Sequence, residues 1–345
     1  MSLTIDEPAL RAIGWNAHCA AALAAMPDAI GRPARVIEQH RAHLVVHDGA
    51  EGLKAKTLTA LFDRLEANTD GLAVGDWVLI NEDGGSLYIH EALPRRSLLL
   101  RSRADNGVQR IAANVDNAIL VMALDNDYSP NRLERYLLMV RSADVTPIIV
   151  LTKPDRATDL DAQRAEIAAL AGPGTPIFAL DARTPAVVAA LAPWLAEGQT
   201  LVLLGSSGVG KSTLVNSLLG SEAQRTGHTR AYDDRGRHTT TTRTLRTLPQ
   251  GACLIDMPGV RELKLGGEED VTADAFEDIA ELARHCRFRD CRHGAEPGCA
   301  VVAGLPPERL DNYRKLRSEL AATAQKRLEA PTVVVTRRSK KREPR

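Results

Sequence analysis

The chain has 345 residues, 44% of them apolar and 26% charged, and its 44 basic side chains balance its 44 acidic ones. This composition is typical of a globular protein with room for two or three domains. The chain contains no internal repeat, and no run reaches the roughly 18 apolar residues of a membrane-spanning helix. A repeat architecture and a membrane-embedded protein are therefore excluded, and no membrane partner is expected.

Residues 1–32 are predicted to form a helical extension that packs on the body of the protein. The stretch 17–26 is apolar enough to imitate the core of a signal peptide, but Asp6, Glu7 and His18 do not fit that pattern. We therefore expect a cytoplasmic protein whose cysteines are reduced.

Residues 33–93 are predicted to form a closed barrel of the OB type. Gly and Asp turns separate most of its short strand-like runs, at 34–37, 44–47, 53–57, 77–80 and 87–90. Such barrels often bind nucleic acid, but Trp77 and Tyr88 are the only aromatic residues well inside the strands, so a protein-binding or spacing role stays open. The arginines that follow either track a phosphate backbone or form a solvated linker: Arg95, Arg96, Arg101, Arg103 and Arg110.

Residues 94–265 have the alternating pattern of a βαβ array, which predicts a mostly parallel sheet with helices on both faces. Apolar runs expected to form strands cover 117–124, 147–151, 176–180 and 200–204. Segments with helical periodicity lie between them, near 130–143, 159–171 and 185–195. The chain is thus expected to be a multidomain α/β protein with the barrel first.

A glycine-rich loop follows the last of these strands and precedes an amphipathic helix. Its sequence is Gly205-Ser206-Ser207-Gly208-Val209-Gly210-Lys211-Ser212, with Thr213 next. The glycines let backbone N–H groups surround an anion, and the helix N-terminus adds its partial positive charge. In this pattern Lys211 reaches the outer phosphates and Ser212 places its hydroxyl on Mg²⁺. The loop is predicted to bind a nucleoside triphosphate.

The sequence Thr152-Lys153-Pro154-Asp155 follows the strand 147–151, at the edge where open α/β sheets bind ligands. It resembles the Asn-Lys-x-Asp guanine motif of GTPases. The carboxylate of Asp155 accepts from both the ring N–H and the exocyclic amine of guanine, while the stem of Lys153 lies along the base. Adenine offers no such pair of donors, so the motif predicts guanine binding.

A third GTPase element, Asp256-Met257-Pro258-Gly259, resembles the Asp-x-x-Gly sequence that senses Mg²⁺ and the γ-phosphate. In ordinary GTPases the guanine motif comes last, whereas here it precedes the phosphate loop. Cutting the sheet between the two and rejoining the old termini gives this order without changing the packed domain. The sequence therefore predicts a circularly permuted GTPase.

Residues 266–325 are predicted to form a zinc-binding helical module. Three of the five cysteines gather there with a histidine, as Cys286, Cys291, His293 and Cys299. Such a set suits a closed tetrahedral Zn²⁺ site, and four protein ligands indicate one structural rather than catalytic ion per chain. Residues 326–345 hold eight Lys or Arg against two Glu, and this basic tail either contacts an anionic partner or is a solvated end.

The order of these elements, together with Gly236-Arg237-His238-Thr239-Thr240-Thr241, resembles the ribosome small-subunit-dependent GTPase A family (RsgA, YjeQ) over residues 30–320. The resemblance implies an N-terminal OB barrel, a central permuted GTPase domain and a C-terminal zinc module. It also implies binding of GTP and GDP with Mg²⁺, contacts with 16S rRNA, and GTP hydrolysis stimulated by the 30S subunit in late assembly. We expect a monomer.

Two positions depart from the family's pattern. Thr152 stands where the family usually has Asn, whose amide braces the guanine loop against the phosphate loop, so weaker nucleotide affinity is expected. Residues 179–182 stand in place of the Ser-Ala loop behind the guanine but match it poorly, which leaves Asp181 and Ala182 as candidate contacts.

The predicted catalytic groups are Lys211, Thr240 and His238. Ser212, Thr240 and Asp256 are expected around Mg²⁺, and Gly259 is expected to present its N–H to the γ-phosphate. Val260 stands where Ras-like GTPases carry the water-orienting Gln, so His238 is the candidate to orient or deprotonate water; the alternative is a His in a mobile polar loop. Two other functions stay open: a GTP-sensing RNA-binding placeholder, and a phosphate-loop ATPase with an accidental Thr-Lys-Pro-Asp.

Overall fold

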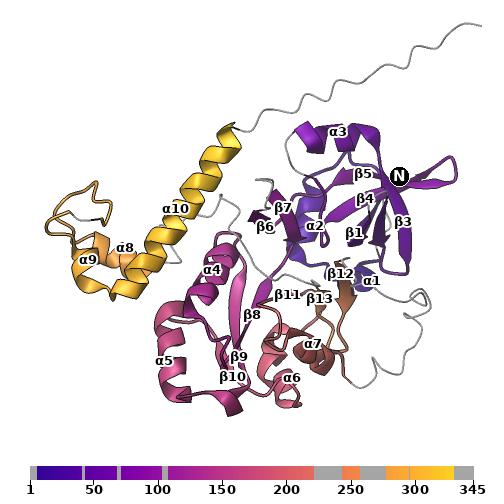
Figure 1. The fold of residues 1–345 in the computed structure, drawn as a ribbon. Helices are drawn as coiled ribbons and strands as arrows, with labels where there is room; N and C mark the ends of the chain where they lie inside the picture. The colour runs from indigo at the N-terminus through magenta and orange to yellow at the C-terminus, as the bar shows by residue number, and fades with distance from the viewer. Residues whose placement is uncertain are drawn as a thin grey trace, which may run out of the picture.

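The computed structural model describes residues 6–40, 43–67, 71–102, 108–220, 243–256, 277–294 and 296–329. Over this part of the chain, an N-terminal barrel is followed by a parallel sheet with helices on both faces and then by a helical C-terminal module (Figure 1). The predicted multidomain α/β architecture is therefore confirmed.

The N-terminal end of the chain forms two short helices and then the barrel. The elements are α1 (Glu7–Arg11), α2 (Ala17–Ala24), β1 (Arg32–Gln39), β2 (Leu44–His47), β3 (Gly52–Thr57), α3 (Thr59–Ala67), β4 (Trp77–Asp83) and β5 (Ser86–Ala92). β1 pairs antiparallel with both β2 and β4, while β3 and β5 pair in parallel and complete the closure. Asn16 begins α2, because its side-chain oxygen accepts from the N–H groups of His18 and Cys19 at 3.1 and 3.3 Å.

Trp77 belongs to the core rather than to the surface of the barrel. Its side chain is 1% exposed, and its ring meets that of Trp15 edge-on, with 4.7 Å between the centroids. Leu10 and Ile13 pack in the same cluster, so the N-terminal helices lie on the barrel. Trp77 is therefore not available to stack on a nucleic acid.

The segment that leaves the barrel contains a hairpin that the sequence pattern does not predict, β6 (Leu98–Ser102) and β7 (Val108–Ala113). Arg95 donates to both carboxylate oxygens of Asp76, at 2.6 and 2.7 Å, and Arg96 pairs with Asp116. Both carboxylates are buried. These two arginines therefore compensate internal charges, and they form neither a phosphate track nor a solvated linker.

The central sheet has the strand order β10-β9-β8-β11-β13-β12, and only β12 runs antiparallel to its neighbour. Its strands are β8 (Asn117–Ala123), β9 (Thr146–Thr152), β10 (Ile177–Ala179), β11 (Thr200–Leu204), β12 (Thr244–Thr247) and β13 (Cys253–Asp256). The helices between them are α4 (Pro130–Arg141), η1 (Pro154–Arg156), α5 (Leu160–Ala171), α6 (Ala186–Leu191), η2 (Ala192–Trp194) and α7 (Lys211–Leu219).

Successive residues of β8 point to opposite faces of the sheet and enter different cores. Ala118, Leu120 and Met122 pack with α4 and α5 on one face. Ile119 and Val121 pack with α6 and α7 on the other. All seven residues of β8 are buried, which is the pattern of a central parallel strand covered on both sides.

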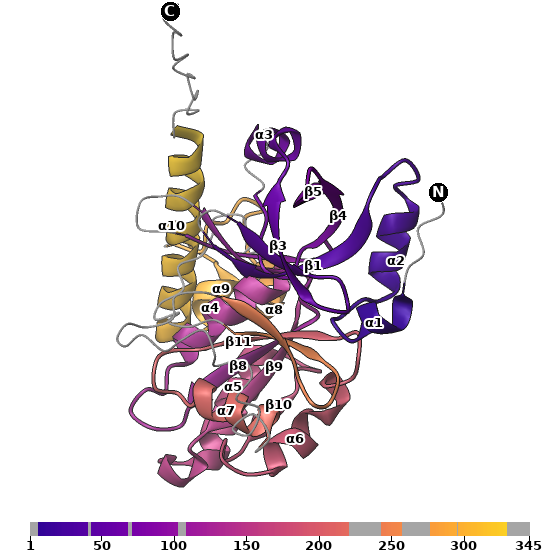
Figure 2. The same ribbon diagram turned by 90° about the vertical axis from the view of Figure 1, so that its right-hand side faces the viewer.

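The barrel and the parallel sheet are continuous with each other. β12 pairs with β1 through Glu38 and Thr244, so the strands form one sheet with the order β10-β9-β8-β11-β13-β12-β1-β2-β3-β5-β4. Turning the molecule by 90° shows the barrel strands above the parallel strands, with α1 and α2 at their side (Figure 2). No local feature of the sequence predicts this junction, because it depends on one pairing between distant segments.

The C-terminal module consists of α8 (Glu277–Ala283), α9 (Ala300–Gly304) and α10 (Pro307–Glu329). Val301, Tyr313 and Leu316 pack in the same core as α4, so the module lies against the face of the sheet that α4 covers (Figure 1). Within the described segments, no helix is long and apolar enough to cross a bilayer.

Candidate nucleotide site and metal centre

The phosphate loop joins β11 to α7 as predicted, and its glycines are required by its geometry. Gly205 has a φ of 152°, and a Cβ there would lie 2.3 Å from the carbonyl oxygen of Val121 on the neighbouring strand. Gly208 and Gly210 have φ values of 84° and 101°, which other residues rarely adopt. The loop therefore follows a path that a Cβ at these positions would block or strain.

Lys211 lies within this loop, with its ammonium group turned back onto the backbone. Its Nζ donates to the carbonyl oxygen of Gly205 at 2.7 Å and to that of Ser206. Burial lowers the pKa of Lys211, and the nearby carboxylates of Asp127 and Asp256 act in the opposite direction. The lysine is thus surrounded by acceptors at the position where the motif binds outer phosphates.

The guanine motif lies directly beside the phosphate loop. Thr152, the last residue of β9, is 1% exposed, and its hydroxyl donates to the carbonyl oxygen of Val209 at 2.6 Å. The Nζ of Lys153 donates to the carbonyl oxygen of Gly208 at 2.9 Å. Thr152 therefore braces the guanine loop against the phosphate loop, which is the contact that the missing Asn was expected to supply. Asp155 lies in η1 with an exposed side chain.

The candidate loop behind the guanine is joined to the helix that follows the phosphate loop. The carbonyl oxygen of Ala182 accepts a hydrogen bond from Ser217 of α7 at 2.6 Å. The Asp181 carboxylate pairs with Arg183 at 2.7 Å, and this contact lowers the pKa of Asp181 to about 2. Asp181 is therefore ionised and already engaged by a neighbouring cation.

Asp256 is the last residue of β13, next to β11 in the sheet, so it ends at the same edge as the phosphate loop. Ser207 and Ser212 are exposed there, and Thr213 is half-buried at the start of α7. Four predicted site residues lie outside the described residues: His238, Thr240, Gly259 and Val260. The structure thus brings together the guanine motif, the phosphate loop and Asp256.

Sequence reasoning missed three charged residues between β8 and the first turn of α4. Asp125 binds Lys153, and Asp127 binds Arg132, which also donates to the hydroxyl of Ser206. None of them belongs to a known nucleotide motif. One signal was available: Asp125 follows a buried parallel strand at its carboxyl end, the same position that made Thr152 a candidate.

The Cys/His cluster of the C-terminal module has the dimensions of a tetrahedral zinc site. The Sγ atoms of Cys286 and Cys299 are 3.8 Å apart, and they lie 3.6 and 3.5 Å from the Nδ1 of His293. Sulfur ligands about 2.3 Å from Zn²⁺ at the tetrahedral angle are about 3.8 Å apart, and a sulfur and a nitrogen ligand about 3.5 Å. The donor atoms of all four residues, Cys291 included, lie within 4.8 Å of one another.

His293 is positioned as a metal ligand by its surroundings. Its side chain is 7% exposed, and burial lowers its pKa, which favours the neutral imidazole that binds metal. Its carbonyl oxygen accepts from Arg314 of α10 at 2.8 Å. Cys19 and Cys253 are buried elsewhere and belong to the apolar cores, as predicted.

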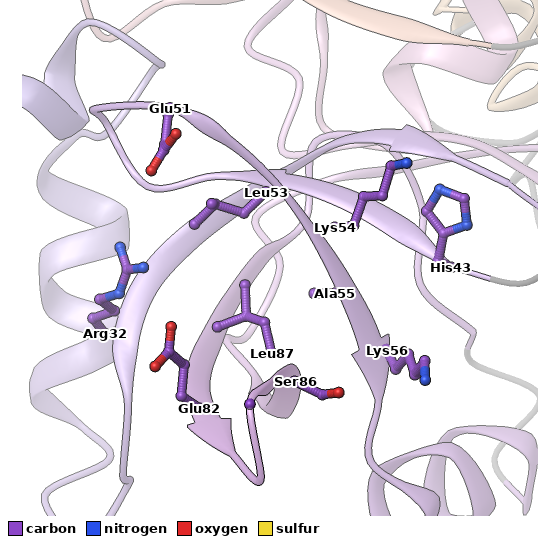
Figure 3. A pocket seen from close by; sticks show the side chains of 11 residues that line it. Arg32, His43, Glu51, Leu53, Lys54, Ala55, Lys56, Glu82, Ser86 and Leu87 are labelled. Atoms are coloured by element: carbon purple, nitrogen blue, oxygen red, sulfur yellow. The ribbon is translucent and has the colours of Figure 1, made fainter.

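The barrel carries a separate cavity of about 570 Å³ between β3 and the turn that joins β4 to β5 (Figure 3). Lys54 and Lys56, two residues apart on β3, line it together with Arg32 and His43. The acidic side chains of its lining are Glu51 and Glu82, and no Phe, Tyr or Trp is among the lining residues. The cavity can therefore accept an anion, and His43 supplies the ring of its lining.

The fold and the site define a circularly permuted GTPase with a C-terminal module that carries a Cys/His cluster. The model of the RsgA GTPase family matches residues 92–266, and a model described as a 50S ribosome-binding GTPase matches residues 200–338. The chain is 48% identical to the small ribosomal subunit biogenesis GTPase RsgA of Xanthomonas oryzae pv. oryzae strain PXO99A, over 93% of this chain and 91% of that protein. The chain belongs to the RsgA GTPase family.

Other similar proteins agree with this assignment. The RsgA of Xanthomonas axonopodis pv. citri strain 306 is 46% identical over 93% of this chain and 91% of that protein. The crystal structure of YjeQ from Thermotoga maritima superposes with a TM-score of 0.61 at 25% identity, covering 84% of this chain and 98% of that one. YloQ, described as a circularly permuted GTPase, gives 0.57 at 26% identity, covering 84% and 95%.

Proposed function

We propose that this protein binds the 30S ribosomal subunit and hydrolyses GTP during late assembly of that subunit. The observation that most supports a working nucleotide site is the bond between Thr152 and Val209, at 2.6 Å, which joins the guanine loop to the phosphate loop despite their exchanged order. The names of the relatives supply the small subunit as partner. Such an enzyme works in the cytoplasm, where subunits assemble, and we expect it to act as a monomer.

In this proposal each part of the site has a separate task. Asp155 selects guanine, with Lys153 along the base and the 181–182 loop behind it. Residues 205–213 enclose the phosphates, and Ser212, Asp256 and Thr240 would hold Mg²⁺, which neutralises charge on the β- and γ-phosphates. His238 orients or deprotonates the attacking water, because Val260 can neither donate nor accept a proton. Cys286, Cys291, His293 and Cys299 would hold one structural Zn²⁺.

Two exposed basic surfaces support contact with 16S rRNA. The first is the barrel cavity, whose cations suit phosphate groups (Figure 3). The second is the metal-binding loop, where Phe288 is 42% exposed and the guanidinium carbon of Arg287 lies 5.6 Å from the centre of its ring. Arg289 follows, also exposed. An exposed ring with a guanidinium group beside it is suited to an unpaired base and its phosphate. The basic tail, 326–345, is a third candidate.

The test is a GTPase assay with purified 30S subunits, 50S subunits or neither. We expect slow turnover alone and at least a tenfold rise with 30S subunits, because the subunit orders the residues that contact the γ-phosphate. The 50S arm is informative because one matching model describes a 50S-binding GTPase. Lys211→Ala should abolish turnover, whereas His238→Ala should keep GTP and subunit binding and lose most of the stimulated rate.

The outcome also separates the alternatives. Binding of the 30S subunit in the presence of GTP, without stimulated turnover, would favour the placeholder function. Equal affinity for ATP and GTP would favour the ATPase. Stimulation by 50S subunits alone would contradict the proposed partner.

A further inference from the structure

Asp125 lies at the end of the nucleotide site where the guanine motif and the phosphate loop meet. It follows β8 and its Oδ2 accepts from the Nζ of Lys153 at 2.7 Å. Its Oδ1 accepts from the N–H of Asp127 at 3.0 Å. The hydrogen bond from Lys153 is the largest cause of the lowered pKa of Asp125, so the carboxylate is ionised at neutral pH. Both of its oxygens are engaged, which fixes the direction in which the carboxylate points.

The side chain of Lys153 is thereby tied at two places. Its Nζ also donates to the carbonyl oxygen of Gly208, at 2.9 Å. Three separate segments meet at this one ammonium group: the loop after β8, the guanine loop and the phosphate loop. Lys153 binds Gly208 and Thr152 binds Val209, so two consecutive residues of the phosphate loop are fixed to the guanine motif.

Lys153 needs such anchors because its own conformation is unfavourable. Its φ of 56° places the backbone in the left-handed region, which is unfavourable for a residue with a Cβ. A free lysine side chain also has many rotamers, and ordering it costs conformational entropy. An anchor that orders Lys153 before the nucleotide arrives removes that cost from the binding step.

We propose that Asp125 is a positioning residue of the nucleotide site: it holds the ammonium group of Lys153 so that the lysine stem forms one side of the guanine pocket in the empty protein. This inference rests on the proposed function, because it requires the site to bind guanine nucleotides. Asp125 itself does not touch the nucleotide; it acts through Lys153.

The same loop also reaches the other end of the phosphate loop. Asp127 binds Arg132 through both carboxylate oxygens at 2.9 Å, and Arg132 donates to the hydroxyl of Ser206. The segment between β8 and α4 is therefore linked to the phosphate loop in two places. Asp127 binds Arg132 of α4, which contacts Ser206, and Asp125 binds Lys153, which contacts Gly208. Asp125 is the member of this segment that is linked to the base-binding side.

The experiment measures the dissociation of fluorescently labelled GDP and GTP from the full chain, chased with unlabelled nucleotide. We expect Asp125→Ala to accelerate dissociation of both nucleotides about five- to tenfold, which reflects a charged hydrogen bond discounted for its partial exposure. Asp125→Asn should accelerate dissociation only about two- to threefold, because the amide oxygen still accepts from Lys153. Asp161→Ala, an exposed carboxylate on α5, is the matched control and should match the wild type.

Two further measurements separate positioning from general damage. Asp125→Ala should raise the KM for GTP by a larger factor than it lowers kcat, because the residue lies beside the guanine motif. In the Lys153→Ala background, Asp125→Ala should have no additional effect on dissociation.

Additive effects of the two substitutions, or dissociation of Asp125→Ala at the wild-type rate, would overturn the inference while leaving the proposed function intact. A wild-type chain that fails to bind guanine nucleotides would overturn both.

Discussion

Arg35, which is buried, and Arg309, which is half-buried, both lie where the central sheet meets a neighbouring part of the molecule, but their partners differ in kind. Arg35, on β1, is 0% exposed and donates to the Thr200 hydroxyl and to three carbonyl groups, those of Ile13, Gly75 and Asn114. Among the described residues, no carboxylate bonds to it. Arg309, on α10, pairs instead with Glu134 of α4 and with Asp278 of α8.

The different partners of the two arginines indicate how firmly the barrel and the C-terminal module are attached to the central sheet. A buried guanidinium without a carboxylate is tolerated only where fixed acceptors surround it, and the pairing of β12 with β1, which joins the barrel to the central sheet, provides that rigidity. Gly14 leaves room for it, because a Cβ there would lie 2.0 Å from an Arg35 nitrogen. The C-terminal module is joined through side chains between helices. Burial alone would lower the pKa of Arg309, but its bonds to Asp278 and Glu134 outweigh burial and raise it.

Removal of the proposed zinc should have the largest effect on stability. The effect should be confined to the C-terminal module, which is joined to the sheet through side chains. Binding of a structural zinc is worth on the order of 10 kcal/mol, more than any single contact at either junction. Cys299→Ser should therefore lose the zinc and unfold residues 277–329, which proteolysis and hydrogen exchange would detect. GTP affinity should be unchanged, because the phosphate loop lies on the sheet.

Cys253→Ala is the control, because it removes a buried thiol outside the cluster. Freshly purified wild-type protein without zinc would refute the metal assignment. Loss of GTP affinity together with the zinc would show that the module and the sheet fold as one unit.

Arg35→Ala should be the next most damaging change. It leaves the carbonyl oxygens of Ile13 and Asn114 and the Thr200 hydroxyl without this donor, while the Gly75 carbonyl keeps the hydrogen bond from Asn114, so we expect a loss of roughly 4 kcal/mol in the free energy of unfolding. Urea unfolding followed by tryptophan fluorescence measures this directly, since Trp77 packs under the guanidinium at 5.3 Å. Arg11→Ala, at an exposed arginine of α1, is the control. A loss below about 1 kcal/mol would mean that the sheet does not need the guanidinium.

Arg309→Gln should destabilise by about 3 kcal/mol, because it leaves the 1% exposed carboxylate of Glu134 without its cation. Hydrogen-exchange protection should fall in α8 and α10 and stay unchanged elsewhere. Adding Glu134→Gln to that variant removes the unpaired charge and should recover more than half of the loss. If the double variant is less stable than the single one, Glu134 contributes in some way other than by pairing with Arg309.

The two junctions also differ from the strands in how far the sequence could predict them. Strands such as β11 and β2 were predicted at their observed bounds, because local alternation and apolar runs carry that information. The contact of β1 with β12, the burial of Trp77 and the partners of Arg35 depend on segments far apart in the chain, and no local pattern encodes them. In the site, the three nucleotide motifs were found because their spacing is characteristic. Asp125 was missed because its role exists only once Lys153 lies beside it.

Thr152 provides the smallest expected effect and the finest test, since it joins two loops inside the site by one neutral hydrogen bond. Thr152→Val keeps the shape but leaves the carbonyl oxygen of Val209 without its donor, so we expect a loss of about 1 kcal/mol in stability. GDP should dissociate several-fold faster, because the guanine and phosphate loops then move independently. Thr152→Ser retains the hydroxyl and should match the wild type in the same dissociation assay. If Thr152→Val released GDP at the wild-type rate, the hydrogen bond from Thr152 to Val209 would contribute to stability alone. The presence of Thr in place of the family's usual Asn would then have no consequence for nucleotide binding.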